Sequence, residues 1–311
     1  MPSPLPQAVE LAMAQRAMRM HHALWHTARN GWSTFPANVR QVFTNLGWKP
    51  PRPALDAAGN PILDNASGED FLYMHRQMIG QVNKQLRQLH DPTYPKVEGW
   101  KSIPAPGDAA YPVPSPYSLG DPQGDAWLAQ VKSPGYFAST ILPQASKFDD
   151  PAYLRTISLG ELGARVEFTV HNWCHMRFSA KPTAMRPDPS PTNPTAIATK
   201  WDKPSYDWLG DFYSSHVNST FWKLHGWVDD RVGAWKTAHG VTGPIKWKGK
   251  WVGKMTMSGG MGGMHRHLAA AGTDASSPEL DRHADVLDEL LRAAVTAGPL
   301  ATPALRVDVP D

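Results

Sequence analysis

Two pairs of histidines, each spaced four residues apart, are the side chains of this sequence best suited to chemistry. The first pair is His22 and His26, and the second is His171 and His175. On a helix, side chains at this spacing lie on one face, so the two imidazoles of a pair can hold one metal ion. A third histidine from a facing helix would complete a site with three nitrogen ligands. Because the pattern occurs twice, the sequence predicts two metal ions that face each other.

One histidine downstream of each pair is the candidate for the third ligand, His75 for the first site and His225 for the second. Two rivals are weighed against this set. His21 competes with His22, but only His22 has a histidine one helical turn further on. His216 lies nine residues before His225 and could replace it. The favoured metal ligands are His22, His26, His75, His171, His175 and His225.

The chemistry of this ligand set favours copper. Imidazole is a borderline ligand that suits copper in both oxidation states. The single cysteine and the lack of an evident His-plus-carboxylate cluster argue against structural zinc and non-heme iron. Zinc proteases need a Glu directly after the first His of the pair, where this chain has Ala23 and Asn172. Three imidazoles for each copper leave a position free, so two facing coppers can bind dioxygen as a bridging peroxide.

Three segments around these histidines carry longer motifs. Residues 70–78 read Asp-Phe-Leu-Tyr-Met-His-Arg-Gln-Met, residues 171–175 read His-Asn-Trp-Cys-His, and residues 218–229 read Asn-Ser-Thr-Phe-Trp-Lys-Leu-His-Gly-Trp-Val-Asp. In this order they resemble the copper segments of the type 3 dicopper proteins, the family of tyrosinases, catechol oxidases and arthropod hemocyanins and phenoloxidases. The family's segments contain Tyr-Met-His-Gln-Gln, His-Asn-x-Gly-His, and Asp-Pro-x-Phe followed by a ligand His and an Asp. Here Asn-Ser replaces Asp-Pro, but the Phe, His and Asp keep the spacing.

The resemblance covers residues 8–30, 68–90 and 157–236 and implies an enzyme with two copper ions as cofactors. The expected reaction is the oxidation of phenolic substrates by dioxygen, as ortho-hydroxylation of monophenols, oxidation of catechols to quinones, or both. Two alternatives stay open. One is an o-aminophenol oxidase or an N-oxygenating relative, and the other is a dioxygen-binding protein without catalysis. The expected partners are dioxygen, a small phenolic or aminophenolic substrate, and a copper-delivery protein.

The resemblance also suggests roles for residues beside the ligands. Glu167, four residues before His171, and Asn172 are predicted to hold a water, with the carboxylate acting as general base through it. A solvated or salt-bridged carboxylate is the competing interpretation of Glu167. Met176 corresponds to a position that borders the substrate entrance in tyrosinases. Asp229 is a candidate to orient a ligand histidine, with a helix-surface ion pair as the alternative.

Composition favours a folded protein that acts on small molecules. The chain is 41% hydrophobic and 19% charged, and its formal net charge of +3 does not require a polyanionic partner, so neither nucleic acid nor a membrane is expected. The lack of a signal-like start and the lone Cys174 favour a cytoplasmic location, with export by a carrier protein left open. The basic segment 246–254 is read as a short β-hairpin with its two Trp side chains inward.

Helices with long Pro-rich connections must position the histidines. Their patterns and end signals predict a mainly α fold, a helical bundle holding a dicopper centre in a single tyrosinase/hemocyanin-like domain over residues 1–311. The copper core is placed at about residues 8–240, and the hairpin, a Gly/Met loop, a helix and a tail at 241–311. Ser67 is expected to cap its helix. The expected helices are 8–29, 37–46, 67–90, 150–178 with a break near 160–163, 219–239 and 277–297.

Overall fold

The computed structural model describes residues 5–187, 197–253 and 278–296, and these residues form a mainly helical fold. The described residues contain no strand, and an isolated bridge between Leu55 and Pro61 is their sole β-type pairing. None of their helices is both long and apolar enough to cross a membrane. The mainly α prediction is therefore confirmed.

The predicted hairpin at 246–254 is wrong for residues 246–253, the part that the structure describes. The backbone of this segment is bound to carboxylates instead of to a second strand. Glu69 accepts the N–H groups of Lys248 and Gly249, and Asp70 accepts that of Trp251 at 2.7 Å. These backbone N–H groups are therefore not available for hydrogen bonds to a neighbouring strand.

The first expected helix is two helices, α1 (Gln7–Ala14) and α2 (Arg16–Gly31). Gln15 interrupts them with an extended backbone, φ −58° and ψ 138°. Arg19 donates from its Nε to the Ala14 carbonyl at 2.8 Å, which gives a partner to one of the carbonyls that the end of α1 leaves free. The next helix, α3 (Ala37–Asn45), lies where the sequence predicts it.

Helix α4 (Ser67–Leu89) also matches its prediction, but Ser67 does not cap it. Ala66 occupies the cap position in the left-handed region, with φ 63° and no side-chain cap. The acidic first turn is present, and it binds the 246–251 segment described above. Gly68 has a packing role, because a Cβ there would lie 2.0 Å from the carbonyl oxygen of Gly160. Glycine therefore permits the close crossing of α4 over the helix that contains Gly160.

The single helix expected over residues 150–178 is instead divided into several helical segments. Helix α8 (Pro151–Leu154) ends early, and α9 (Leu159–Val166) starts at a new cap, where Ser158 accepts the Glu161 N–H at 3.0 Å. The expected break near 160–163 is wrong, because Gly160 and Gly163 continue α9 and pack against Gly68. A π-helical turn, η2 (Glu167–His171), leads into α10 (Asn172–Phe178).

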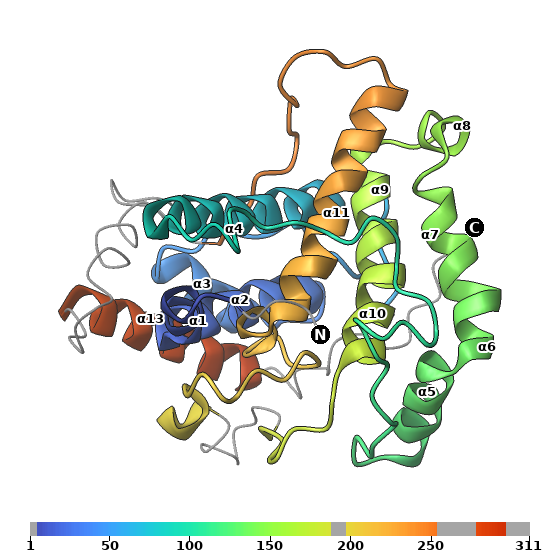
Figure 1. Ribbon diagram of the computed structural model, residues 1–311. Coiled ribbons are helices and arrows are strands. Elements are labelled where there is room, and N and C mark those ends of the chain that lie inside the picture. The colour runs from blue at the N-terminus through green and yellow to red at the C-terminus, as the bar shows by residue number, and fades with distance from the viewer. Residues whose placement is uncertain (1–4, 188–196, 254–277, 297–311) are drawn as a thin grey trace.

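Helix α11 (Ser219–Ala238) carries the last predicted ligand, and Asn218 caps it by accepting the Thr220 N–H at 2.9 Å. Helix α13 (Pro278–Thr296) packs on α2 and α3 through its buried leucines, including Leu287 and Leu290. In Figure 1, α2 and α4 lie across the view, whereas α11 and the α9–α10 pair run steeply beside their ends. The four predicted metal-bearing helices therefore face a common interior.

A group of helices absent from the prediction packs against α10. Two of these helices begin where an N-cap residue directly precedes a proline, at Asp121-Pro122 and at Ser133-Pro134. The short turns η4 (Thr199–Trp201) and η5 (Ser215–Val217) lie in the connection before α11. The unpredicted helices are α5 (Pro122–Lys132), α6 (Pro134–Tyr136), η1 (Phe137–Ile141) and α7 (Leu142–Lys147).

Lys132, the last residue of α5, binds the C-terminus of α10. Its ammonium group donates to the carbonyls of Arg177 at 3.0 Å and Ser179 at 2.7 Å, and it lies 5.5 Å from the centre of the Tyr117 ring. These bonds satisfy carbonyls that the helix end leaves without partners. Burial, and then the Arg177 guanidinium, lower the pKa of Lys132 to about 7.

We expect the free energy of unfolding to rise as the pH increases from about 7 to about 9, because unfolded lysine keeps its proton up to about pH 10. In that window the folded state binds fewer protons than the unfolded state, so raising the pH favours folding. Lys132→Met should flatten the rise, as measured by urea unfolding at several pH values. The control is Lys84→Met, at an exposed lysine of α4. If the free energy of unfolding rises equally with pH in the wild type and in Lys132→Met, the lowered pKa of Lys132 is contradicted.

Candidate metal centre

The structure brings the first three predicted ligands together. His22 and His26 project from one face of α2, and His75 projects from α4 toward them. The ring centroids of His22 lie 4.8 Å from His26 and 5.8 Å from His75. One potential ligand atom from each of the three side chains lies within 4.8 Å of the others, and all three residues are buried.

The second three predicted ligands also meet. The Nε2 atom of His171, at the end of η2, lies 3.1 Å from Nε2 of His175 on α10 and 3.1 Å from Nε2 of His225 on α11. His75 adjoins this group too, since its ring stacks on that of His225 with centroids 4.4 Å apart. His75, His171 and His225 have ligand atoms within 4.8 Å of one another. The two groups of imidazoles are therefore direct neighbours.

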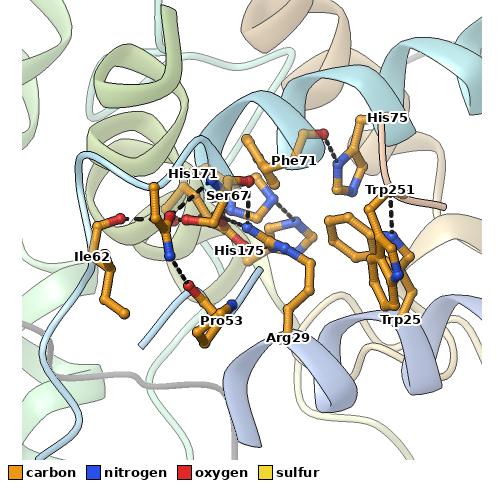
Figure 2. Close-up of polar contacts among 12 residues, drawn as sticks. Trp25, Arg29, Pro53, Ile62, Ser67, Phe71, His75, His171, His175 and Trp251 are labelled. Atoms are coloured by element: carbon orange, nitrogen blue, oxygen red, sulfur yellow. Dashed lines mark hydrogen bonds and ion pairs between the residues drawn. The ribbon is translucent and has the colours of Figure 1, made fainter. Parts of the chain in front are cut away.

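Backbone carbonyls fix the protonation of five of these rings. A carbonyl oxygen only accepts, so an imidazole nitrogen bonded to one must carry the proton. Three of these histidines donate from Nδ1 to the carbonyl four residues earlier: His75 to Phe71 at 2.9 Å, His171 to Glu167 at 3.2 Å and His225 to Phe221 at 2.8 Å. Figure 2 shows the His75–Phe71 bond. The two others donate to a separate loop, His22 to Phe212 at 2.6 Å and His175 to Leu209 at 2.8 Å.

In each of these five rings the Nε2 atom consequently has a free lone pair. The Nε2 atoms of His22 and His75 are buried without a hydrogen-bond partner. Those of His171 and His225 face each other with no proton between them. Buried acceptors that point at one another repel, and a cation bound between them removes that cost. The donor set and its orientation therefore fit metal ions with imidazole ligands.

Burial also keeps the six rings neutral, which is the form that binds metal. Desolvation is the main cause of the lowered pKa in every case. It lowers the pKa of His22 to about 3 and that of His175 to about 4. The pKa is also well below its usual value for His26, His75, His171 and His225.

The two rival histidines occupy different places. His216 does not replace His225, because its ring lies 4.8 Å from His22 and its Nε2 donates to the Met13 carbonyl at 3.1 Å. The ring of His21 lies 5.5 Å from that of Trp48. Neither belongs to the two groups of potential ligands described above.

Glu167 is salt-bridged. Its two carboxylate oxygens accept from Arg29 of α2 at 2.6 and 2.9 Å, and both side chains are buried. Arg29 also donates to the Ser67 carbonyl at 2.8 Å, a contact visible in Figure 2. Burial raises the pKa of Glu167, and the Arg29 guanidinium opposes that rise. This geometry favours the salt-bridge alternative over the water-holding role predicted for this residue.

The other predicted residues border the histidine cluster. Asn172 is buried, with its side chain beside the His171 ring. Met176 is buried next to a loop glycine, because a Cβ on Gly210 would lie 3.0 Å from the Met176 Sδ atom. Asp229 accepts from Arg76 at 2.6 Å, a half-exposed ion pair, and this agrees with the alternative interpretation of that residue.

Sequence reasoning missed two contributors to the cluster. The loop containing Leu209 and Phe212 supplies the two carbonyls described above, and the Phe212 ring stacks on His26 with centroids 4.1 Å apart. The π-helical turn η2 places His171 next to the Glu167 carbonyl, and such turns often occur at functional sites. A backbone carbonyl leaves no mark in the residue type, so no sequence signal pointed to either.

A scan of the sequence against protein-family models gives no match, and a search of curated proteins finds no relative with significant similarity.

Proposed function

We propose that this chain holds two copper ions and oxidises phenols with dioxygen. The observation that supports this most directly is the meeting of two buried groups of neutral imidazoles whose Nε2 lone pairs converge. Each group offers imidazole nitrogens alone, and within the described residues neither potential metal group includes a carboxylate or a cysteine. Non-heme iron and structural zinc sites use such ligands, so the donor set favours copper.

Copper, when bound in such a pair of sites, supplies the binding and reduction of dioxygen. The chain's own contribution is to orient the imidazoles and to exclude water. Three ligands are oriented by carbonyls of their own helices, and the loop carbonyls orient His22 and His175. Imidazoles held in this way would already be oriented before a metal ion binds, so binding would require little rearrangement of the chain.

The proposed substrate is a small phenol that approaches beside Met176, whose thioether would pack against an aromatic ring. Asn172 is the polar side chain nearest the same ligands in sequence, and we propose that it orients the substrate hydroxyl or a water. Glu167, engaged by Arg29, is assigned the support of His171 through its main-chain carbonyl.

The test is to load the protein with copper and to assay a monophenol, a catechol and an o-aminophenol side by side, following both oxygen uptake and coloured product. We expect oxidation of at least one of these with copper and none with zinc, which binds imidazole but has no redox chemistry. Failure with all three substrates, despite bound copper, would contradict the enzymatic proposal. Reversible oxygen uptake without product would indicate the dioxygen-binding alternative.

A further inference from the structure

We infer that Asp211 and Arg186 are positioning residues that act on both metal groups through a single loop. This inference rests on the proposed copper centre. The loop comprises residues 203–214 and is called the orienting loop below. It lies between the Pro-rich connection and α11, and it contributes no metal ligand of its own.

The orienting loop contacts one histidine pair on each side. The Leu209 carbonyl accepts from His175 Nδ1 at 2.8 Å, and the Phe212 carbonyl accepts from His22 Nδ1 at 2.6 Å. The Phe212 ring also stacks on His26, nearly parallel, with an interplanar angle of 8°. One short loop therefore fixes the tautomer of a ligand in the first group and of a ligand in the second.

Asp211 lies between these two carbonyls and holds the loop in shape. Its buried carboxylate accepts from Arg186 Nε at 2.8 Å and from a second Arg186 nitrogen at 2.7 Å. It also accepts from the Tyr206 hydroxyl at 2.9 Å and from the Tyr213 N–H at 3.0 Å. A bidentate guanidinium pair gives geometric precision as well as attraction, and here both partners are 8% exposed.

A second arginine ties the ends of the loop to α2. Arg19, three residues before His22, donates to the carbonyls of Lys203 at 2.8 Å and Tyr206 at 2.9 Å near the start of the loop, and to that of Tyr213 at 3.4 Å near its end. These bonds hold both ends of the loop. Within the loop, the Ser214 hydroxyl donates to the Trp208 carbonyl at 2.8 Å, and the Asp211–Arg186 pair is the charged contact beside Leu209 and Phe212. We therefore expect Asp211 and Arg186 to keep the two carbonyls that face the metal groups in place.

The effect should be selective among the histidines. His75, His171 and His225 donate to carbonyls of their own helical segments, so the orienting loop does not set their tautomers. Loosening the loop should release His22 and His175 alone, one imidazole from each group. Both copper ions should then bind more weakly, by about 10- to 100-fold, the usual effect of losing a group that orients a ligand.

The experiment compares the wild type with Asp211→Asn and Arg186→Gln by nitrogen-15 NMR of the histidine rings, first without metal. We expect His22 and His175 to lose their pure Nδ1–H tautomer in both variants, while His75, His171 and His225 keep theirs. Arg186→Lys, which keeps the charge without the bidentate geometry, should be intermediate. Unchanged tautomers of His22 and His175 in both variants would overturn the inference, as would equal changes in all five rings.

The affinity for copper, measured by titration, provides a second and independent test. We expect both ions to weaken together in Asp211→Asn, whereas Asp56→Asn should bind copper as the wild type does. Asp56 is a matched control, because its carboxylate organises an exposed loop by accepting the N–H groups of Ala58 and Asn60. Undiminished affinity for both ions in Asp211→Asn would also overturn the inference. A wild type that binds no copper would refute the proposed function, and the ring tautomers would still decide whether the loop acts as inferred.

Discussion

Replacing His225 with Gln should leave one copper ion per chain and lower phenol oxidation by more than about a hundred-fold. Replacing a residue that only orients a metal ligand typically lowers metal affinity or activity by about 10- to 100-fold. A larger loss is expected here, because His225 is proposed as a ligand of the second group. The first group, His22, His26 and His75, stays intact and should keep its ion. Copper per chain is measured after dialysis, and activity by oxygen uptake.

His239→Gln is the control for that experiment. His239 follows α11, the same helix, and its Nε2 donates to the Leu154 carbonyl at 2.8 Å, away from the metal groups. Its replacement should leave the copper content unchanged. Retention of two copper ions by His225→Gln would show that this histidine is not a ligand, and the proposed second site would have to be abandoned.

Arg29→Met should destabilise the protein by about 3–5 kcal/mol, because it leaves the Glu167 carboxylate buried without its partner. The Ser67 carbonyl would lose its donor as well. Replacing both partners by apolar residues, Arg29→Met with Glu167→Leu, should recover most of the loss. Urea unfolding of the metal-free protein measures each difference. For comparison, Arg76→Met breaks the half-exposed pair with Asp229 and should cost less than about 1 kcal/mol.

The ion pair between Arg29 and Glu167 also bears on the role of Glu167 in the proposed reaction. If the carboxylate only holds Glu167 against Arg29, while the main-chain carbonyl of Glu167 orients His171, Glu167→Gln should lower monophenol hydroxylation and catechol oxidation by the same factor. A general base predicts a larger loss for hydroxylation, since only that reaction starts from a monophenol that must be deprotonated. A selective loss would restore the role that the sequence first suggested.

The sequence predicted most of the metal-bearing helices from local signals, although the Ser67 cap and the hairpin at 246–254 were wrong. The four-residue histidine spacing and the helix over 219–239 could be predicted directly, because helical periodicity and nearby end signals determine them. The helices that start at Asp121-Pro122 and Ser133-Pro134 had equally local signals that were not used.

Long-range contacts account for what could not be predicted. Nothing near Arg29 indicates that it will be buried against Glu167, a partner 138 residues away. Gly160 and Gly163 resemble a helix break in isolation, and only the approach of Gly68 shows their packing role. The carbonyls of Leu209 and Phe212 carry no residue-specific signal, so the orienting loop emerges only from the structure.

Copper titration followed by electron paramagnetic resonance shows whether the two imidazole groups hold a pair of neighbouring copper ions. We expect two Cu(II) ions per chain, one for each imidazole group, that are magnetically coupled and therefore give almost no resonance signal. Zinc should compete for the same two positions. A full-intensity signal from isolated Cu(II), or fewer than two bound ions in the wild type, would contradict a paired site built from these histidines.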